Sequence, residues 1–468
     1  MQQKTVETKN KLLLINPANQ YRKGFLKRIQ SKQSPLGLGI IAALTPDDFR
    51  IKIWDENFRP FREVEADLVG ITTFTSTAAR AYEIADLYRA KGIPVVMGGI
   101  HVSSLPEEAL EHADAVVIGE AEEIWHQVIS DFKQNKLKGI YRGGLTDMLQ
   151  SPIPRHDLFH PGYIFGSIQT SRGCPMDCEF CSVPAFNGHK YRLRSVESII
   201  SEMKLIPQKL IYFVDDNIIG YGHEAEQHAE KLFRAMIDNN LNKEWFAQAS
   251  LNIAEKPRLL KLASEAGCRM LLIGIEAEKE EQLKESNKRL NLKKGVSSYK
   301  GAFRTIHKAG IAVLGAFIFG MDSDQPQDLY NRAKFIMRSA VDVTQASILT
   351  PLPGTRLFDK LKGEGRLHTP EGVSKWQYFH FGDVVFSPKQ MTSDELAMHM
   401  QRIYKRITSL HNLRLHFIRT LWNTKNIRTA IWAWNSNINY RYALREKPVK
   451  SNLQTNEQEK DTTSSLSG

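Results

Sequence analysis

The sequence predicts an α/β protein that has an amino-terminal doubly wound parallel sheet, a partial barrel of six β/α units and a mainly helical C-terminal region. Two successions of short β-branched runs and helical patterns, separated by a stretch rich in glycine and proline, predict the two α/β units. A chain of 468 residues is also too long for one compact core. We therefore expect a sheet domain at 1–140, a linker at 141–162, a barrel at 163–390, a basic and aromatic helical region at 391–449 and a disordered tail at 450–468.

The first succession has short buried strands separated by helical patterns. The strands are expected at residues 12–15, 50–54, 68–73, 95–97 and 115–118, and the helices at residues 36–44, 78–90, 106–112 and 121–132. Such an alternation favours a parallel sheet with helices on both faces. Its ligand crevice would lie at the carboxyl ends of the strands.

The second succession predicts six further β/α steps. Strands are expected at residues 167–171, 210–215, 245–249, 270–276, 311–319 and 344–350, with helices at residues 224–238, 257–266, 299–309 and 329–339 among them. Six steps suit an open or partial barrel, in which chemistry gathers at the carboxyl ends of the strands. Three cysteines follow the first of these strands directly.

Composition limits where the protein works and what it binds. Hydrophobic residues at 42% and charged residues at 25% are ordinary for a soluble globular chain, while the net charge of +11 suits an anionic ligand, a nucleic acid or a membrane surface without choosing among them. The polar start lacks the apolar core of a secretory signal, and the longest apolar stretch, 311–321, is too short to span a bilayer. We expect a cytoplasmic protein, with attachment to a membrane surface left open.

The cysteines form the most specific pattern in the chain. Three of the four lie in the spacing Cys174-x3-Cys178-x2-Cys181, which is typical of metal binding and not of a disulfide framework. Three thiolates on a [4Fe–4S] cluster leave one iron free for another ligand. The alternative is a structural zinc site completed by His189, which is disfavoured because no second pair of closely spaced cysteines is present. Cys268 lies in a helix-like stretch and is expected to be a small buried hydrophobe.

The segment around the three cysteines, residues 171–181, resembles a known sequence signature. Ser171-Arg172-Gly173-Cys174-Pro175-Met176-Asp177-Cys178-Glu179-Phe180-Cys181 resembles the signature of the radical S-adenosylmethionine superfamily. The resemblance implies that S-adenosylmethionine binds the open iron and is cleaved reductively to methionine and a 5′-deoxyadenosyl radical. It also implies an electron donor such as ferredoxin or flavodoxin.

Four polar residues at predicted strand ends are candidates for contact with S-adenosylmethionine: Asp215, Asp216, Asn217 and Glu276. Carboxylates would bind its ammonium group or its ribose hydroxyls. The alternative is a structural role in caps and turns, and the sequence leaves both interpretations open.

The amino-terminal half resembles the cobalamin-binding domain fused to one branch of this superfamily. The matching pieces are Pro35-Leu36-Gly37-Leu38, Trp54-Asp55-Glu56-Asn57, Val69-Gly70-Ile71-Thr72, Val96-Met97-Gly98-Gly99-Ile100-His101 and Val117-Ile118-Gly119-Glu120. Gly98, Gly99 and Gly119 are candidates for close backbone contact with cobalamin.

One motif of many cobalamin proteins is missing from this half. The D-x-H-x-x-G sequence that supplies a histidine ligand to cobalt is absent, and Asp55-Glu56-Asn57 occupies roughly its place. His101 is a substitute candidate, with a contact to the corrin edge or an ordinary loop role as alternatives. A nucleotide-binding sheet is the rival interpretation of the domain, disfavoured because no G-x-G-x-x-G follows the first strand.

The region between Arg402 and Arg445 mixes basic and aromatic residues. Such a mixture suits a helix in an anionic membrane interface, a cap over a large apolar substrate, or a helical cap whose aromatic residues pack on the barrel. No nucleic-acid partner is expected, because no binding motif accompanies the charge.

The resemblance implies a cobalamin-dependent radical methyltransferase. Methylcobalamin would deliver a methyl group to a carbon of a large apolar biosynthetic intermediate, either a tetrapyrrole such as bacteriochlorophyllide or a hopanoid or other isoprenoid. The first rival is a radical cyclase or rearrangement enzyme on the same scaffold. The second is a non-catalytic protein that binds cobalamin or an iron–sulfur cluster. A methylthiotransferase is disfavoured because its second cluster needs three more cysteines and only Cys268 remains.

Overall fold

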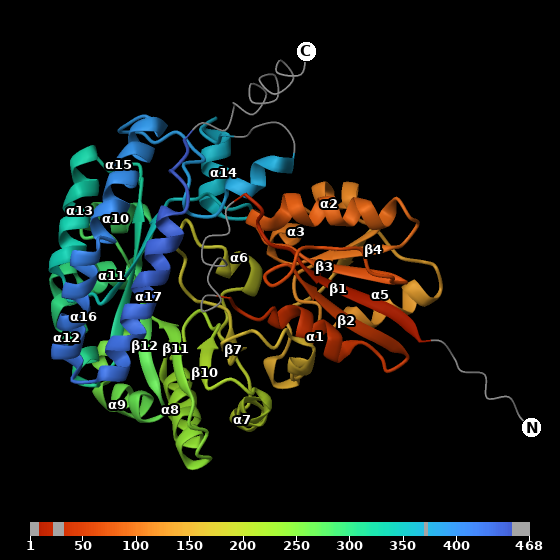
Figure 1. Ribbon diagram of the computed structural model, residues 1–468, viewed down its shortest axis with the longest axis horizontal. Coiled ribbons are helices and arrows are strands. Elements are labelled where there is room, and N and C mark those ends of the chain that lie inside the picture. The colour runs from red at the N-terminus through yellow and green to blue at the C-terminus, as the bar shows by residue number, and fades with distance from the viewer. Residues whose placement is uncertain (1–8, 22–31, 369–372, 452–468) are drawn as a thin grey trace, which may run out of the picture.

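The computed structural model describes residues 9–21, 32–368 and 373–451. Figure 1 shows the amino-terminal sheet domain on the right, in red to orange, and the barrel with its C-terminal helices on the left. Each part contains one six-stranded parallel sheet. Beyond residue 451, the predicted disordered tail lies outside the described residues.

The amino-terminal sheet is doubly wound, as predicted. Its strands are β1 (Asn10–Asn16), β2 (Phe49–Asp55), β3 (Leu68–Thr72), β4 (Val95–Gly98), β5 (Ala115–Ile118) and β6 (Ile140–Arg142). They are parallel in the order β2-β1-β3-β4-β5-β6. The order reverses between β1 and β3, and such a switch point opens a ligand crevice at the strand ends.

Five helices cover the two faces of this sheet. They are α1 (Leu36–Leu44), α2 (Ala78–Arg89), α3 (Ile100–Ser104), α4 (Pro106–His112) and α5 (Trp125–Lys133). Buried residues of α1 and α5 pack in one apolar cluster, and those of α2 and α4 pack in another. The five predicted strands and four predicted helices are confirmed, whereas the short elements α3 and β6 were not predicted. Because β6 ends at Arg142, the sheet extends into the segment expected to be a linker, and the domain boundaries stay a prediction.

The second sheet winds in one direction, as a partial barrel does. Its strands are β7 (Phe165–Ile168), β10 (Leu210–Phe213), β11 (Glu244–Ala249), β12 (Cys268–Glu276), β13 (Ala312–Phe319) and β14 (Val343–Ile348). They are parallel and pair in consecutive order. The expectation of a helical environment for Cys268 is wrong, because this residue begins β12. It is fully buried, as expected.

Short and long helices surround this sheet. They are α6 (Val183–Asn187), α7 (Val196–Leu205), α8 (His223–Asp238), α9 (Pro257–Glu265), α10 (Glu280–Glu285), α11 (Arg289–Lys294), α12 (Tyr299–Lys308), α13 (Pro326–Arg338) and α14 (Arg356–Gly363). A two-stranded antiparallel ribbon of β8 (Ser171–Arg172) and β9 (Arg192–Leu193) holds the two ends of the cysteine segment. The segment that carries the cysteines is therefore closed at both ends by the hydrogen-bonded pair β8–β9.

Three helices end the described chain: α15 (Ser393–Ile407), α16 (Leu410–Thr424) and α17 (Ile427–Arg445). Ala433 of α17 packs in an apolar cluster with Met270, Leu314 and Val343 of the sheet. The last helix thus lies across the barrel strands (Figure 1). No helix in the described ranges is long and apolar enough to cross a bilayer.

The segment after the barrel packs on the amino-terminal domain. Trp376, Tyr378 and Phe379 are buried in the same apolar cluster as α2. The indole Nε1 of Trp376 also donates to Glu108 Oε1 at 2.7 Å. These contacts fix the orientation of the two sheets relative to one another.

Candidate functional site

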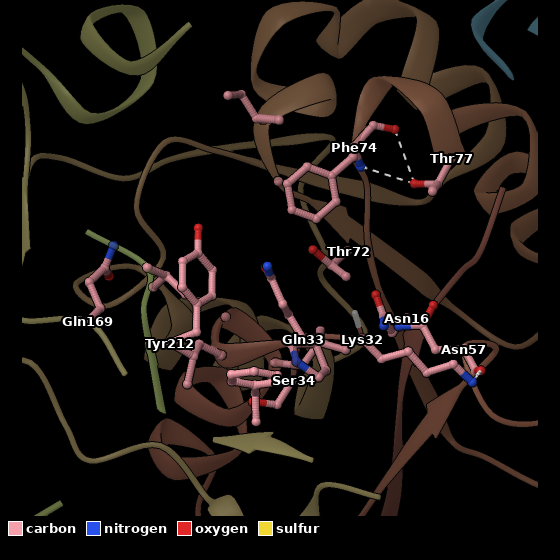
Figure 2. Close-up of a pocket in the computed structure, with 18 of the residues that line it drawn as sticks. Asn16, Lys32, Gln33, Ser34, Asn57, Thr72, Phe74, Thr77, Gln169 and Tyr212 are labelled. Carbon is pink, nitrogen blue, oxygen red and sulfur yellow. Dashed lines mark hydrogen bonds between the residues drawn. The ribbon is translucent and has the colours of Figure 1, made fainter. Parts of the chain in front are cut away.

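A cavity of about 1300 Å³ lies between the two domains. It is lined by residues at the carboxyl ends of β1, β3, β4 and β5 on one side and by Gln169, Arg172 and Asp216 of the barrel on the other. Figure 2 shows Asn16 and Thr72 of the sheet domain facing Gln169 and Tyr212 of the barrel. Ordinary small-molecule pockets hold about 300–1,000 Å³. This cavity therefore has room for more than one small molecule.

The cysteine segment leaves β8 through Gly173, whose backbone no other residue could adopt without strain. Gly173 has φ +93°, and a Cβ here would lie 2.1 Å from the carbonyl oxygen of Lys190. The backbone N–H of Cys174 donates to Gly188 O at 3.1 Å, and that of Cys181 donates to Cys178 O at 3.2 Å. The loop is thus held in one compact shape that carries all three thiols.

Side chains from distant parts of the barrel hold the middle of the cysteine segment. Arg356 pairs with Asp177 at 2.7 Å and with Glu179 at 3.1 Å. Asn287 donates to the backbone oxygen of Asp177, and Glu179 N–H donates to Ser286 O at 3.2 Å. The loop between the cysteines is therefore anchored at several points.

The three thiols are half-buried and form no disulfide. Burial raises the pKa of Cys174 and Cys178 above the ordinary value and raises the pKa of Cys181 to about 12. Without a metal these groups are protonated, and iron binding would displace their protons. No three His, Cys, Asp or Glu side chains in the described residues stand close enough to share a single metal ion. A cube-shaped cluster places each thiolate on a separate iron, so the loop suits three of its corners.

Of the three predicted polar residues after β10, the structure places only Asp216 in the cavity. Asp215 is buried behind it and accepts hydrogen bonds from Thr170 Oγ1 at 2.7 Å and from Ser171 Oγ at 2.6 Å. Asn217 is also buried and donates to Ser250 Oγ at 3.3 Å. Asp215 and Asn217 therefore hold the strand ends and do not line the cavity.

Asp216 has an electrostatic environment unlike that of a surface carboxylate. Burial raises its pKa to about 6, and the charge of Asp215 adds to this effect. Asn187 Nδ2 donates to Asp216 Oδ2 at 3.4 Å. A cationic ligand in the cavity would favour the charged form of Asp216.

Glu276 at the end of β12 is buried and has φ +64°. It accepts a hydrogen bond from Lys288 Nζ at 2.6 Å. Although burial acts to lower it, the pKa of Lys288 is raised by the negative charge of Glu276 and by Cys178. Lys288 is thus a cation beside the cysteine loop, and no sequence motif marks it. Glu276 does not line the cavity.

The predicted glycines line the sheet-domain side of the cavity. Gly98 ends β4, Gly99 follows β4 and Gly119 follows β5, and all three border the cavity. Gly99 has φ +108°, and a Cβ there would lie 2.8 Å from the carbonyl oxygen of Thr73. This backbone therefore requires glycine and presents a surface without side chains to a ligand, which fits a bulky cofactor.

The structure places His101, the substitute candidate for a cobalt ligand, outside the cavity lining. Its side chain is fully buried and does not line the cavity. Nδ1 lies 3.3 Å from Thr75 Oγ1 and Nε2 lies 3.4 Å from Glu108 Oε1. Both ring nitrogens therefore face protein groups, so neither is directed at the crevice or at a corrin edge.

Several cavity residues were missed because no motif marks them. They include Lys32, Gln33, Ser34, Phe74, Gln169 and Tyr212. Phe74 is exposed to the cavity, and its loop is closed by hydrogen bonds of 3.2 and 3.1 Å between its backbone and Thr77 Oγ1 (Figure 2). Such residues become neighbours only when two domains meet.

The C-terminal helix α17 forms one wall of the cavity. Trp432 and Tyr440 face it together with polar Asn435, Ser436 and Asn439. Trp432 meets Phe165 edge to face at 5.4 Å. Helix α17 therefore packs on the barrel, as one interpretation of the basic, aromatic region expects, and it forms part of the cavity wall.

The fold and this site define an α/β enzyme. A glycine-lined crevice faces Val183, Phe186 and Asn187 across one cavity, and these three residues belong to the segment that carries the cysteines. Two family models match the chain, the B12 binding domain at residues 22–129 and the radical SAM superfamily at residues 168–336. The first model covers the glycine crevice, and the second covers the cysteine segment and Asp216.

Curated relatives match over most of the chain. The bacteriochlorophyllide d C-12(1)-methyltransferase of Chlorobaculum tepidum is 28% identical over 425 residues, which is 86% of this chain and 88% of the relative. The hopanoid C-2 methylase of Rhodopseudomonas palustris is 31% identical over 389 residues, which is 78% of this chain and 73% of the relative. The chain therefore belongs to the cobalamin-dependent radical S-adenosylmethionine methyltransferase family, whose cofactors are a [4Fe–4S] cluster, S-adenosylmethionine and cobalamin.

Solved structures share the whole architecture. The radical S-adenosylmethionine methyltransferase TsrM from Kitasatospora setae, with cobalamin and a [4Fe–4S] cluster bound, has a TM-score of 0.62 at 18% identity over 78% of each chain. The cobalamin-dependent enzyme OxsB with aqua-cobalamin bound has a TM-score of 0.66 at 13% identity, covering 94% of this chain and 80% of that one. At these identities the likeness concerns the fold alone. An anaerobic magnesium-protoporphyrin IX monomethyl ester cyclase is a weaker relative, at 24% identity over 383 residues, so the cyclase alternative is not favoured.

Proposed function

We propose that this protein methylates a carbon of a large apolar ring compound, either a tetrapyrrole of the bacteriochlorophyllide type or a hopanoid. The observation that carries the proposal is the single cavity that joins the glycine crevice to the barrel interior and is lined mainly by apolar surface. Relatives named for bacteriochlorophyllide and for hopanoids support the substrate class. A rigid polycyclic compound loses little conformational freedom on entering such a space.

We assign the cofactor contacts to the following residues. Cys174, Cys178 and Cys181 would hold the cluster, and Gly98, Gly99 and Gly119 would let cobalamin approach the backbone. When bound, the cluster supplies the electron that cleaves S-adenosylmethionine, and cobalamin carries the methyl group. Asp216 lines the cavity just after β10 and would accept hydrogen bonds from S-adenosylmethionine.

Charges around the cysteine loop support its role at this position. The Lys288 cation lies beside the thiols and would offset part of the negative charge of a thiolate-bound cluster. Glu276 orients that lysine through its 2.6 Å hydrogen bond. We therefore assign Glu276 a positioning role and not direct contact with S-adenosylmethionine.

Aromatic side chains inside the barrel suit a flat or rigid substrate. Tyr212 and Phe246 stack with their ring centroids 4.4 Å apart, and Phe165 and Trp432 lie next to Phe246. Tyr440 OH donates to Gln345 Oε1 at 2.7 Å and so adds a polar pair beside these aromatic rings. We infer that ring surfaces of the substrate stack here while one polar substituent meets Gln345 or Asn439.

Two partners complete the proposal. A small electron carrier of the ferredoxin or flavodoxin type would reduce the cluster. The protein would also work at a membrane surface, because apolar tetrapyrroles and hopanoids partition into lipid. No nucleic acid is required for this chemistry.

The decisive experiment is anaerobic incubation of reconstituted protein with methyl-labelled S-adenosylmethionine, a chemical reductant and each candidate substrate in detergent. A labelled product heavier by one CH2 supports the proposal. Formation of 5′-deoxyadenosine with an unchanged carbon count would indicate a cyclase or rearrangement enzyme. Protein that binds both cofactors but forms no 5′-deoxyadenosine would indicate a non-catalytic role.

A further inference from the structure

Exposed apolar side chains lie on both sides of the connection between α16 and α17. Ile418 and Trp422 of α16 are 62% and 73% exposed, and Ile427 and Ile431 of α17 are 52% and 47% exposed. The short connection Lys425–Asn426 joins the two helices between these pairs. We call Ile418, Trp422, Ile427 and Ile431 the apolar corner. Large apolar groups that are exposed together mark surfaces that bind something.

The chain around the apolar corner carries positive charge only. Residues 396–445 contain nine lysines and arginines and no aspartate or glutamate, so this segment supplies nine of the net +11 charges of the protein. Its cations are Arg402, Lys405, Arg406, Arg414, Arg419, Lys425, Arg428, Arg441 and Arg445. Lys425 Nζ lies 4.2 Å from the centroid of the Trp422 ring, which places a cation directly against the most exposed of these apolar side chains.

Exposed tryptophan with adjacent cations is what an anionic bilayer surface favours. Tryptophan prefers the interface between lipid headgroups and acyl chains. Each cation near an anionic surface contributes about 1 kcal/mol to binding. A second copy of this chain fits less well, because a symmetric dimer would bring the same patch from both copies together, cations against cations.

The apolar corner also lies at one end of the cavity. Ile431 and Arg428 line the cavity although both are exposed. The cavity wall there includes Phe165, Leu210 and Glu244, which are the first residues of β7, β10 and β11. The cavity therefore extends along the barrel from the carboxyl ends of its strands, near Asp216, to their amino-terminal ends.

We propose that the apolar corner docks on an anionic lipid bilayer and that the apolar substrate enters the barrel from the membrane at the amino-terminal ends of its strands. This inference rests on the apolar substrate class of the proposed function. In this arrangement the cofactor sites and the substrate entrance lie at opposite ends of the barrel. The cofactors would meet at the carboxyl ends of the strands, and the substrate would enter at their amino-terminal ends. Phe246, Leu272 and Leu314 give the route between them an apolar wall.

The first test is flotation of full-length protein with vesicles of phosphatidylcholine alone or mixed with phosphatidylglycerol. The wild type is expected to float with the mixed vesicles only, and the double variant Ile418→Ser/Trp422→Ser is expected to lose at least tenfold in binding. Leu205→Ser is the matched control, because Leu205 at the end of α7 is also 62% exposed but lies outside the apolar corner. Wild-type protein that stays unbound, or that binds neutral vesicles equally well, overturns the proposal.

The second test measures orientation. Lipids brominated near the headgroup should quench the tryptophan emission of bound wild-type protein, and Trp422→Phe should remove most of that quenching while the variant still floats. Unchanged quenching in Trp422→Phe would overturn the docking surface. Sedimentation at rising protein concentration checks the rival occupant, because self-association lost in Ile418→Ser/Trp422→Ser would assign the corner to a second copy. Vesicle binding does not depend on methyl transfer, so methylation of detergent-dissolved substrate without flotation would refute docking alone, and flotation without methylation would refute the proposed function alone.

Discussion

Arg172 Nη1 donates to Glu120 Oε2 at 2.9 Å across the boundary between the two halves of the chain. Glu120 follows β5 beside Gly119 in the crevice, and Arg172 ends β8 two residues before Cys174. Arg192 Nη1 of the paired strand β9 donates to the same carboxylate oxygen at 2.9 Å. A single buried carboxylate thus links the predicted cobalamin crevice to the base of the cysteine loop.

Replacing Glu120 by Gln should destabilise the protein in a pH-dependent manner. Although burial acts to raise it, hydrogen bonds and charges of Arg192 and Arg172 hold the pKa of Glu120 below its ordinary value of 4.5. The ion pairs therefore stabilise the native state fully above about pH 4.5, and this stabilisation is lost as the pH falls through the lowered pKa. Removing one partner of a buried pair costs about 3 kcal/mol, so the midpoint of thermal unfolding at pH 7 should fall by roughly 5 °C or more.

Thermal unfolding of the wild type and of Glu120→Gln between pH 7 and pH 3 measures this effect. The difference between the unfolding midpoints of the wild type and of Glu120→Gln should become smaller as the pH falls below about 4.5. Glu83→Gln is the control, because the Glu83 side chain is 62% exposed in its pair with Arg80 and should change stability by less than about 1 kcal/mol. A gap that is constant over this pH range would contradict the assigned ion pairs.

Serine in place of Cys174, Cys178 or Cys181 should abolish the iron–sulfur chromophore in each single variant. Oxygen ligates the iron less well than thiolate, and two thiolates cannot hold the cluster as three do. Iron and sulfide analysis after anaerobic reconstitution gives the measurement. Cys268→Ala should keep the full iron content, although it should lower stability because Cys268 is fully buried.

Alanine variants of the adjacent glycines Gly98 and Gly99 should distinguish the effect of backbone strain from the effect of cofactor contact. Gly99→Ala should destabilise the protein by more than about 1 kcal/mol, because φ is +108° and the new Cβ would lie 2.8 Å from Thr73 O. Gly98→Ala should leave the unfolding midpoint almost unchanged, since the nearest atom to its new Cβ is 3.7 Å away. Both variants should bind hydroxocobalamin more weakly in equilibrium titrations. Wild-type affinity in Gly98→Ala would show that cobalamin does not contact this backbone.

Replacement of His101 by Gln should leave the coordination of bound cobalamin unaltered. The ring is buried between Thr75 and Glu108 and is not directed into the cavity. We expect lower thermal stability from the altered hydrogen bonds, with unchanged absorption and electron paramagnetic resonance spectra of the bound cofactor. Loss of a nitrogen splitting from the spectrum of the reduced cofactor would contradict this placement.

Periodicity and motif spacing predicted the parts of this molecule that are local in sequence. The five buried strands from β1 to β5 were recognisable as short β-branched runs, and the cysteine triplet was recognisable because one loop carries all three ligands. Strand β6 was missed because three residues are too few for a periodic pattern. The predicted helical setting of Cys268 failed because it stands at the junction of a helix-ending turn and a strand, where both patterns overlap.

Contacts between segments that are distant in the chain could not be predicted from the sequence. Asp215 and Asp216 are adjacent, yet one faces Thr170 and Ser171 in the interior and the other faces the cavity. Strand alternation alone could not decide which of the two carboxylates faces the cavity. The partnership of Glu276 with Lys288 and the entry of α17 into the cavity wall depend on tertiary packing in the same way.

Helix α17 is the last regular element of the described chain, and it supplies a wall of the cavity. Domains emerging from the ribosome fold in order from the amino terminus. The barrel strands are therefore complete before Ile427–Arg445 is synthesised, and the nascent enzyme passes through a stage in which its interior stands open on that side. A chain that ended before Ile427 would therefore lack one wall of the cavity.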